Sequence, residues 1–139
     1  MLSSFDRVQC EMSAKLFLYA NKCGYDSEKF TKMLMKSKLG DYLYSKNCVE
    51  TWLGYTYVMS LIRDEVGIPP KGMTYDDNIM EWIGYVYRYW SLTTTDTGNK
   101  IYKLAPFKLM VGGYPGWHCI AISLVIDDIK TYNKQLIKN

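Results

Sequence analysis

The segment from Val49 to Ile62 constrains the fold more than any other part of this chain. Placed on a helical period of 3.6 residues, its apolar side chains cover nearly the whole circumference instead of one stripe. They are, on one side, Val49, Trp52, Met59, Ile62 and Val66, and on the other side Leu53, Tyr57, Val58 and Leu61. A helix that is apolar all round is buried among partners, and Asn47 with Glu50 supplies a capping signal at its start. The sequence therefore predicts a buried central helix over about 48–66.

A six-residue pattern within this segment occurs a second time. Trp52-Leu53-Gly54-Tyr55-Thr56-Tyr57 is matched by Trp82-Ile83-Gly84-Tyr85-Val86-Tyr87. Two copies do not make a stacked repeat array, which needs at least three. Glycine inside a helix costs about 1 kcal/mol relative to alanine, and a second helix packed against the bare backbone would offset that cost. We therefore expect two core helices to cross at Gly54 and Gly84. The alternative is that the Trp and Tyr rings form a ligand cage or a partner-binding surface.

The remaining segments also have helical periodicity, so the sequence predicts an all-α fold. With 139 residues, 48% of them hydrophobic, the chain has the size of a single domain (1–139) with a substantial core. Besides the central segment, helical patterns cover about 3–23, 27–43, 74–90 and 117–136, and a further helix begins or bends near Pro106. We expect a single-domain bundle of five to six helices around the central one.

Two features of the last third are less clear from the sequence. The stretch from Gly112 to Gly116, which contains Pro115, is predicted to form a turn. The apolar run over 119–126 fits a helix or a buried strand equally well by periodicity. Because no other segment offers a convincing strand for it to pair with, a helix is preferred.

Charge and cysteine usage narrow the function classes. The formal net charge of +3 is too small to indicate nucleic-acid binding by itself. Lysines nevertheless gather in two parts of the chain: Lys29, Lys32 and Lys36, and then Lys100, Lys103, Lys108, Lys130, Lys134 and Lys138. Such runs usually mark solvated helix faces. The four cysteines (Cys10, Cys23, Cys48 and Cys119) have no paired spacing and are predicted to be reduced, buried thiols. A disulfide between two of them is the alternative if the chain is exported. With no signal peptide and no membrane-length apolar run evident, we expect a cytoplasmic protein that does not interact with membranes.

Candidate catalytic chemistry is sparse. The single histidine, His118, precedes Cys119, and adjacent helical residues point about 100° apart, so the two are not expected to act as base and nucleophile. None of the nucleotide-binding, hydrolase or metalloprotease motifs occurs, and no cysteine pair has zinc spacing. The paired carboxylates are better explained by helix ends and exposed faces. The sequence therefore predicts no metal site, no cofactor and no enzymatic activity.

Aromatic residues offer the best candidate for a functional surface. The chain has 13 tyrosines and four tryptophans, and these residue types are enriched at protein interfaces. The segment from Tyr85 to Trp90 combines Tyr, Trp and Arg, the three types that dominate interface energetics. Helical spacing assigns Val86 and Trp90 to the core. We therefore predict that Tyr85, Arg88 and Tyr89 bind a partner, next to a mobile polar loop over 93–98; ordinary aromatic packing is the alternative.

The same segment carries a resemblance to a group of known proteins. Tyr87-Arg88-Tyr89-Trp90, a Thr-rich stretch and then Ile101-Tyr102-Lys103 resemble a pattern in small uncharacterised helical proteins of Gram-positive bacteria. The resemblance covers about 74–130, and this chain has His118-Cys119 where such relatives carry a His-Thr pair. Some of those proteins occur in toxin–antitoxin-like gene pairs, so the resemblance implies stoichiometric binding that neutralises a partner enzyme.

Together these observations predict a non-catalytic, protein-binding regulator of antitoxin type. Two other classes remain open. A nucleic-acid-binding regulator would use the lysine-rich segments, although no helix-turn-helix with a basic recognition helix is evident. An enzyme would need a site assembled from residues that the sequence does not connect.

Overall fold

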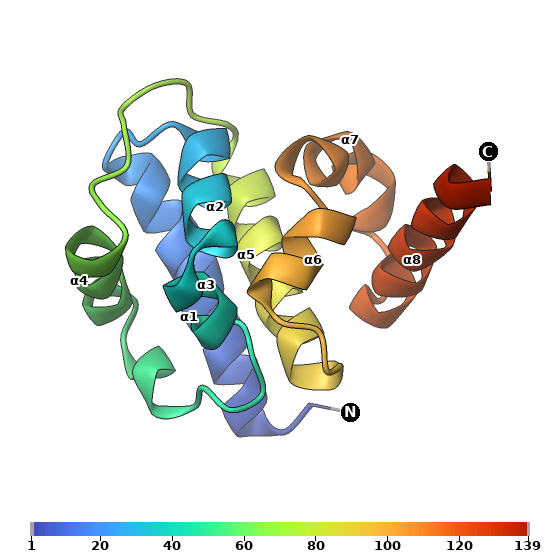
Figure 1. Cartoon of the computed structure of the whole chain (residues 1–139), viewed down its shortest axis with the longest axis horizontal. Coiled ribbons are helices and arrows are strands. Elements are labelled where there is room, and N and C mark those ends of the chain that lie inside the picture. Colours follow the sequence, from blue (N-terminus) through green and yellow to red (C-terminus); the bar gives the residue numbers. More distant parts are fainter. Residues whose placement is uncertain (1, 139) are drawn as a thin grey trace.

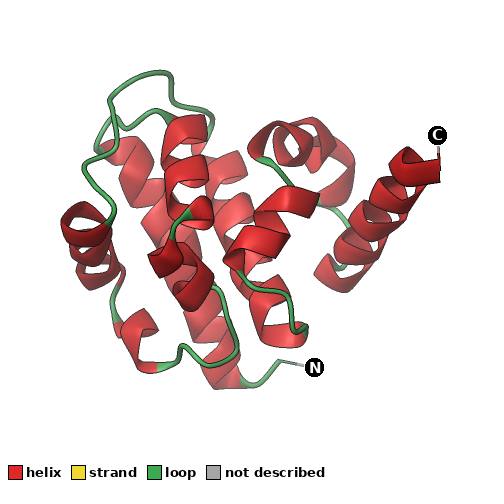
Figure 2. Ribbon diagram, in the orientation of Figure 1, coloured by secondary structure: helices red, strands yellow, loops and turns green. Residues whose placement is uncertain are grey.

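The computed structural model describes residues 2–138, and these form eight α-helices and one short 3₁₀ helix (Figures 1 and 2). In chain order the elements are α1 (Ser4–Lys22), α2 (Ser27–Lys36), α3 (Lys38–Leu43), η1 (Glu50–Leu53), α4 (Tyr55–Glu65), α5 (Asp77–Thr93), α6 (Gly98–Leu104), α7 (Phe107–Trp117) and α8 (Ile122–Lys138). Within these residues no strand is formed, and the only β-type pairing is an isolated bridge between Tyr25 and Lys71. The all-α, single-domain prediction is confirmed, but the number of helices exceeds the five to six expected. None of the helices over 2–138 is long and apolar enough to cross a membrane.

Helices α1 and α5 pack against each other and form the centre of the fold. Ser13 of α1 lies against Gly84 of α5, and Gln9 lies against Arg88, so the two helices run antiparallel. In Figure 1, α2, α3 and α6 lie in front of this pair, α4 lies at one edge and α8 at the other. Ser3 caps α1 in a reciprocal capping box with Asp6, in agreement with the predicted start of that helix.

The prediction of a buried central helix over 48–66 is wrong. The chain instead forms the short η1 and then α4, and Gly54 separates them in an extended conformation (φ −158°, ψ 128°). Trp52 is fully buried and donates a hydrogen bond from Nε1 to the Leu43 carbonyl oxygen at 2.7 Å, which holds η1 against the end of α3. Helix α4 is peripheral, and Tyr57 on its outer face is 58% exposed. The apolar residues that the helical period distributes around one helix therefore belong to two separate elements in different positions.

The predicted crossing of two core helices at Gly54 and Gly84 is wrong, although Gly84 does lie at a close contact between helices. A Cβ atom added at Gly84 would lie 2.6 Å from the Ser13 carbonyl oxygen and 2.9 Å from the Phe17 ring, so α1 and α5 do approach closely there. A Cβ atom at Gly54 would meet nothing within 4 Å. Gly84 therefore packs against α1, whereas Gly54 packs closely against no other part of the chain.

The turn predicted over 112–116 is also wrong, since α7 continues through it to Trp117. The Trp117 ring folds back over Gly113, where an added Cβ would lie 2.0 Å from a ring carbon. Pro115 lies in the final turn of α7 and lacks an amide hydrogen, so one helical bond is lost close to the end, where few bonds remain to be disrupted. The chain turns instead over 118–121, and α8 begins at Ile122, which resolves most of the ambiguous 119–126 run as helix.

Candidate functional site

Arg88 does not lie on the surface that the sequence predicted for it. Its side chain is fully buried, so it cannot contact a partner of the folded protein. The helical spacing of α5 places Arg88 opposite the apolar stripe, but that side of α5 is covered by α1 and by the segment that follows α3. The interface role predicted for Arg88 is therefore incorrect.

The Arg88 guanidinium instead holds together three parts of the chain. It donates hydrogen bonds to five oxygen atoms, which belong to the Gln9 side chain, the carbonyl groups of Leu43, Ser45 and Cys48, and the Ser91 hydroxyl. It also lies 5.6 Å from the centre of the Trp52 ring. No carboxylate is among these partners, and burial lowers the pKa of Arg88 from its usual value. Arg88 is thus a structural residue that satisfies the carbonyl groups after the end of α3.

Tyr85, by contrast, borders an open groove between α1 and α5. The groove has a volume of about 360 Å³ and is lined by Glu11, Ala14, Lys15, Glu81, Trp82 and Tyr85. The Tyr85 side chain is half-buried, and burial is the main cause that raises the pKa of its hydroxyl. Tyr89, one turn further along α5, is also half-buried and packs against the core. Two of the three predicted residues are therefore accessible, and one of them lines a groove.

Trp82 is the residue of this groove that the sequence analysis missed. Its side chain is partly buried against the core and also lines the groove. The Tyr114 ring packs edge-on against it at a centroid distance of 5.4 Å, and His118 stacks on Tyr114 at 4.4 Å. The signal that could have found it is the three-residue spacing of Trp82 and Tyr85, which puts both rings on one helix face. The end of α7 thus supports one wall of the groove.

The loop predicted to be mobile is tied to its surroundings by side chains. Thr97 donates to the Asp41 carboxylate at 2.6 Å, and the Trp90 indole donates to Asp96 at 2.9 Å. Asp96 also forms an ion pair with Lys130 of α8 at 3.1 Å. These contacts fix the connection between α5 and α6 to α3 on one side and to α8 on the other.

His118 and Cys119 lie closer together than their predicted helical positions allow. Both follow the end of α7, and the Cys119 sulfur is 3.5 Å from His118 Nε2 and 3.8 Å from Nδ1. Because these distances are nearly equal, the sulfur is not aligned with either ring nitrogen as direct proton transfer requires. His118 Nδ1 lies 2.6 Å from the Tyr114 carbonyl oxygen, and both side chains are exposed. The pair is adjacent, but its geometry does not support a nucleophile and base.

The cysteines are all free, and only two of them are buried as predicted. Cys10 and Cys48 lie in the interior, whereas Cys23 is half-buried and Cys119 is exposed. Burial raises the pKa of the Cys10 thiol to about 12, which removes it from thiolate chemistry at neutral pH. Within residues 2–138, no three His, Cys, Asp or Glu side chains are grouped so as to hold a metal ion.

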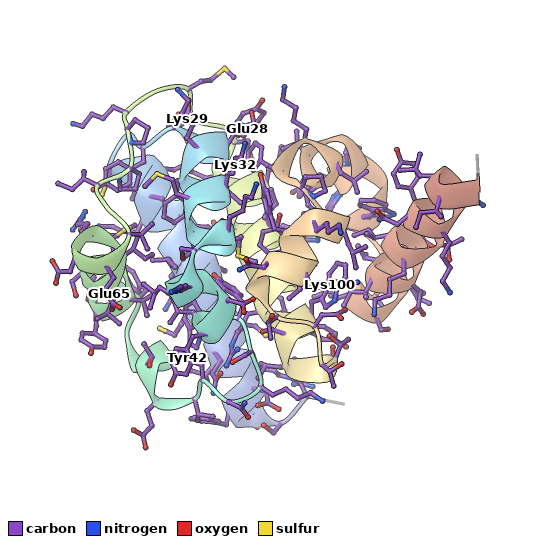
Figure 3. All side chains as sticks on the ribbon, in the orientation of Figure 1. Glu28, Lys29, Lys32, Tyr42, Glu65 and Lys100 are labelled. Carbon is purple, nitrogen blue, oxygen red and sulfur yellow. The ribbon has the colours of Figure 1, made fainter. Side chains whose placement is uncertain are left out.

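The two lysine-rich segments of the sequence meet in the folded protein. Lys32 and Lys36 of α2 and Lys103 of α6 line one groove of about 590 Å³, with Glu28, Asn99, Tyr102 and Pro106. Figure 3 shows Lys29 and Lys32 along α2 and Lys100 on α6. Sequence reasoning treated the two runs separately, because only the packing of α6 on α2 brings them together.

Two surfaces therefore remain as candidates for function, the aromatic groove between α1 and α5 and the lysine-lined groove between α2 and α6. Comparison with known proteins does not choose between them: no protein-family model matches the chain, and neither does any curated protein or solved structure.

Proposed function

We propose that the protein is a non-catalytic regulator that binds another protein through the groove between α1 and α5. The observation that carries this proposal is the partly buried pair Trp82 and Tyr85, which line one open groove with mostly apolar walls. Trp and Tyr supply rigid contact area with a hydrogen-bonding tip and are the commonest interface hot spots. Because the chain resembles antitoxin-like proteins, the expected partner is an enzyme whose activity this protein neutralises when it binds.

The shape of the groove favours a protein segment over a small molecule. Small-molecule sites enclose most of their ligand in about 300–1,000 Å³, whereas this groove is at the small end of that range and open along the two helices. Apolar side chains projecting at three- or four-residue intervals from a partner helix can insert beside Trp82 and Tyr85. Glu11, Lys15 and Glu81 then form a charged rim of both signs around that apolar contact. A partner helix with an apolar stripe flanked by charged residues is the expected ligand.

The test is to isolate the partner from the source cells and map its binding site by mutation. Tyr85→Ala should weaken binding by about 2 kcal/mol or more, the usual hot-spot threshold, with little change in melting temperature. Tyr57→Ala on α4 is the matched control, because Tyr57 is an exposed tyrosine outside the groove lining, and its replacement should leave affinity unchanged. Titration calorimetry gives affinity and stoichiometry together. Equal affinity for the Tyr85 variant and the wild type would place the interface elsewhere.

A further inference from the structure

Lysines from two distant parts of the chain surround the groove between α2 and α6 without carboxylate partners. Within residues 2–138 the only ion pair joins Lys130 to Asp96, so the lining lysines Lys32, Lys36 and Lys103 have no acidic group within 4.0 Å, and neither does Lys29, which lies outside the lining on α2. Of the acidic residues nearby, Asp26 caps α2 through the Lys29 amide, and Asp41 accepts hydrogen bonds from Thr97 and Asn99. Glu28 alone places a negative charge in the groove lining. The groove lining therefore carries three lysines against one carboxylate, and none of these lysines forms an ion pair within residues 2–138.

We propose that this groove binds the phosphodiester backbone of nucleic acid. This site is separate from the groove between α1 and α5 and does not depend on the function proposed for that groove. Lys29, Lys32 and Lys36 are spaced three and four residues apart, so they share one face of α2 over about 10 Å. A duplex strand carries one phosphate per about 3.4 Å of its axis, so this face spans about three phosphates. Lys103 of α6 supplies the opposite wall.

The positive track continues beyond this groove. On the other side of α6, Lys100 and Lys134 line a second groove, between α6 and α8, together with Lys130, which is paired with Asp96. Figure 1 shows α2, α6 and α8 in succession across one side of the molecule. A linear polyanion can therefore cross α6 and remain in contact with lysines on both sides, which a single phosphate group cannot.

The groove is suited to the backbone and not to the bases. Its only aromatic residue, Tyr102, is 8% exposed and presents no face for stacking. The Asn99 amide donates both of its hydrogen bonds internally, to the carbonyl oxygens of Met35 and Ser37. Lysine heads act as hydrated point charges, which attract phosphate without reading sequence. An acidic protein would be expected to bind an accessible aromatic or arginine anchor, and this groove is lined by no arginine and by no aromatic side chain other than the buried Tyr102.

Fluorescence anisotropy with a labelled duplex of arbitrary sequence tests the proposal between about 50 and 200 mM salt. The wild type should bind with a steep salt dependence and without sequence preference. The triple variant Lys32→Gln, Lys36→Gln, Lys103→Gln should weaken binding about tenfold or more at the lower salt, and should reduce the slope of log K against log salt by about 2–3, since each phosphate contact contributes about 0.9. Glu28→Gln should tighten binding.

The control is the triple variant Lys22→Gln, Lys46→Gln, Lys71→Gln, whose exposed lysines lie outside the groove. Both triple variants remove three positive charges and take the net charge from +3 to 0, so a difference between them reports position and not overall charge. Absence of binding at the lower salt, or equal losses in the two variants, would overturn the proposal. Competition by polyglutamate as effective as by unlabelled DNA would also overturn it, in favour of a general polyanion surface. Tyr85→Ala should leave DNA binding unchanged, so this proposal and the proposed function can fail separately.

Discussion

Arg88 shows how far the role of one residue depends on what covers it. On α5 its position is opposite an apolar stripe, and in the folded chain it is a fully buried cation with oxygen partners and no anion. Burying a charge is costly unless hydrogen bonds replace the lost water. The carbonyl oxygens of Leu43, Ser45 and Cys48 replace that water as hydrogen-bond acceptors, and the same bonds hold the segment between α3 and η1 in place.

Replacing Arg88 should therefore affect folding and not binding. Arg88→Met keeps much of the side-chain length but leaves several buried oxygen atoms without donors, and hydrogen bonds to a charged group contribute about 1.5–3 kcal/mol each. We expect the free energy of unfolding in urea to fall by about 3 kcal/mol or more. Arg7→Met, at an exposed arginine of α1, should change it little. If the two variants prove equally stable, the buried network is not a source of stability.

At the scale of elements, the packing of α1 on α5 depends on the missing side chain at Gly84. Ser13 donates from its hydroxyl to the Gly84 carbonyl oxygen at 2.7 Å and also bonds to the Tyr44 hydroxyl at 2.8 Å, so polar contacts hold the helices at this short separation. The Phe17 ring fills the space beside Gly84 and packs edge-on against Phe30 and Tyr87. A larger residue at Gly84 must displace backbone, which cannot yield as a flexible side chain can.

Two alanine substitutions distinguish the glycines of the repeated pattern. Gly84→Ala should lower the free energy of unfolding by about 1–3 kcal/mol, the usual cost of overpacking. Gly54→Ala should change it by no more than about 0.5 kcal/mol, because Gly54 is extended and open. Urea unfolding of both variants measures the difference. A larger loss for Gly54→Ala would show that η1 and α4 require glycine between them.

At the scale of the whole molecule, an ion pair whose strength depends on pH contributes to the attachment of α8. Asp96 joins the α5–α6 connection to α8 by its ion pair with Lys130, and Lys130 also lies 5.9 Å from the centre of the Trp90 ring. Partial burial acts to raise the pKa of Asp96, but the Trp90 and Lys130 hydrogen bonds outweigh it and hold the pKa below its usual value. Further along α8, Leu136 and Ile137 are exposed. The buried side chains of Val125, Ile126 and Ile129 and the Asn133 hydrogen bond to the Leu104 carbonyl oxygen also hold this helix.

The lowered pKa of Asp96 sets the direction of a pH effect. A carboxylate whose folded pKa is depressed stabilises the fold above its unfolded pKa of about 4 and loses that contribution as the pH falls through the folded value. Asp96→Asn should lower the free energy of unfolding by up to about 1 kcal/mol at pH 7, and the difference from wild type should shrink as the pH falls below the unfolded Asp pKa of about 4. Asp64→Asn, on the exposed side of α4, should have no comparable effect. Urea titrations across this pH range measure the difference in the free energy of unfolding between Asp96→Asn and wild type. A difference that persists in acid would contradict a stabilising role for the ionised Asp96 carboxylate.

Local features of the sequence determined the helical class, the start of α1 and the helical nature of α5. Periodicity and capping depend on residues three or four apart, so the chain itself shows them. They do not show which face of a helix another element covers. That was decided by packing: α1 on α5 buried Arg88 and left Trp82 half-exposed.

Tertiary structure also decided where helices break and which charges meet. Gly54 is extended because η1 and α4 pack separately, while the Trp117 ring over Gly113 allows α7 to continue through a sequence that favours a turn. The lysine groove exists because α6 packs on α2. Its residues are far apart in the chain, so no local pattern can relate them, and only the long-range contacts that close the fold bring their charges together.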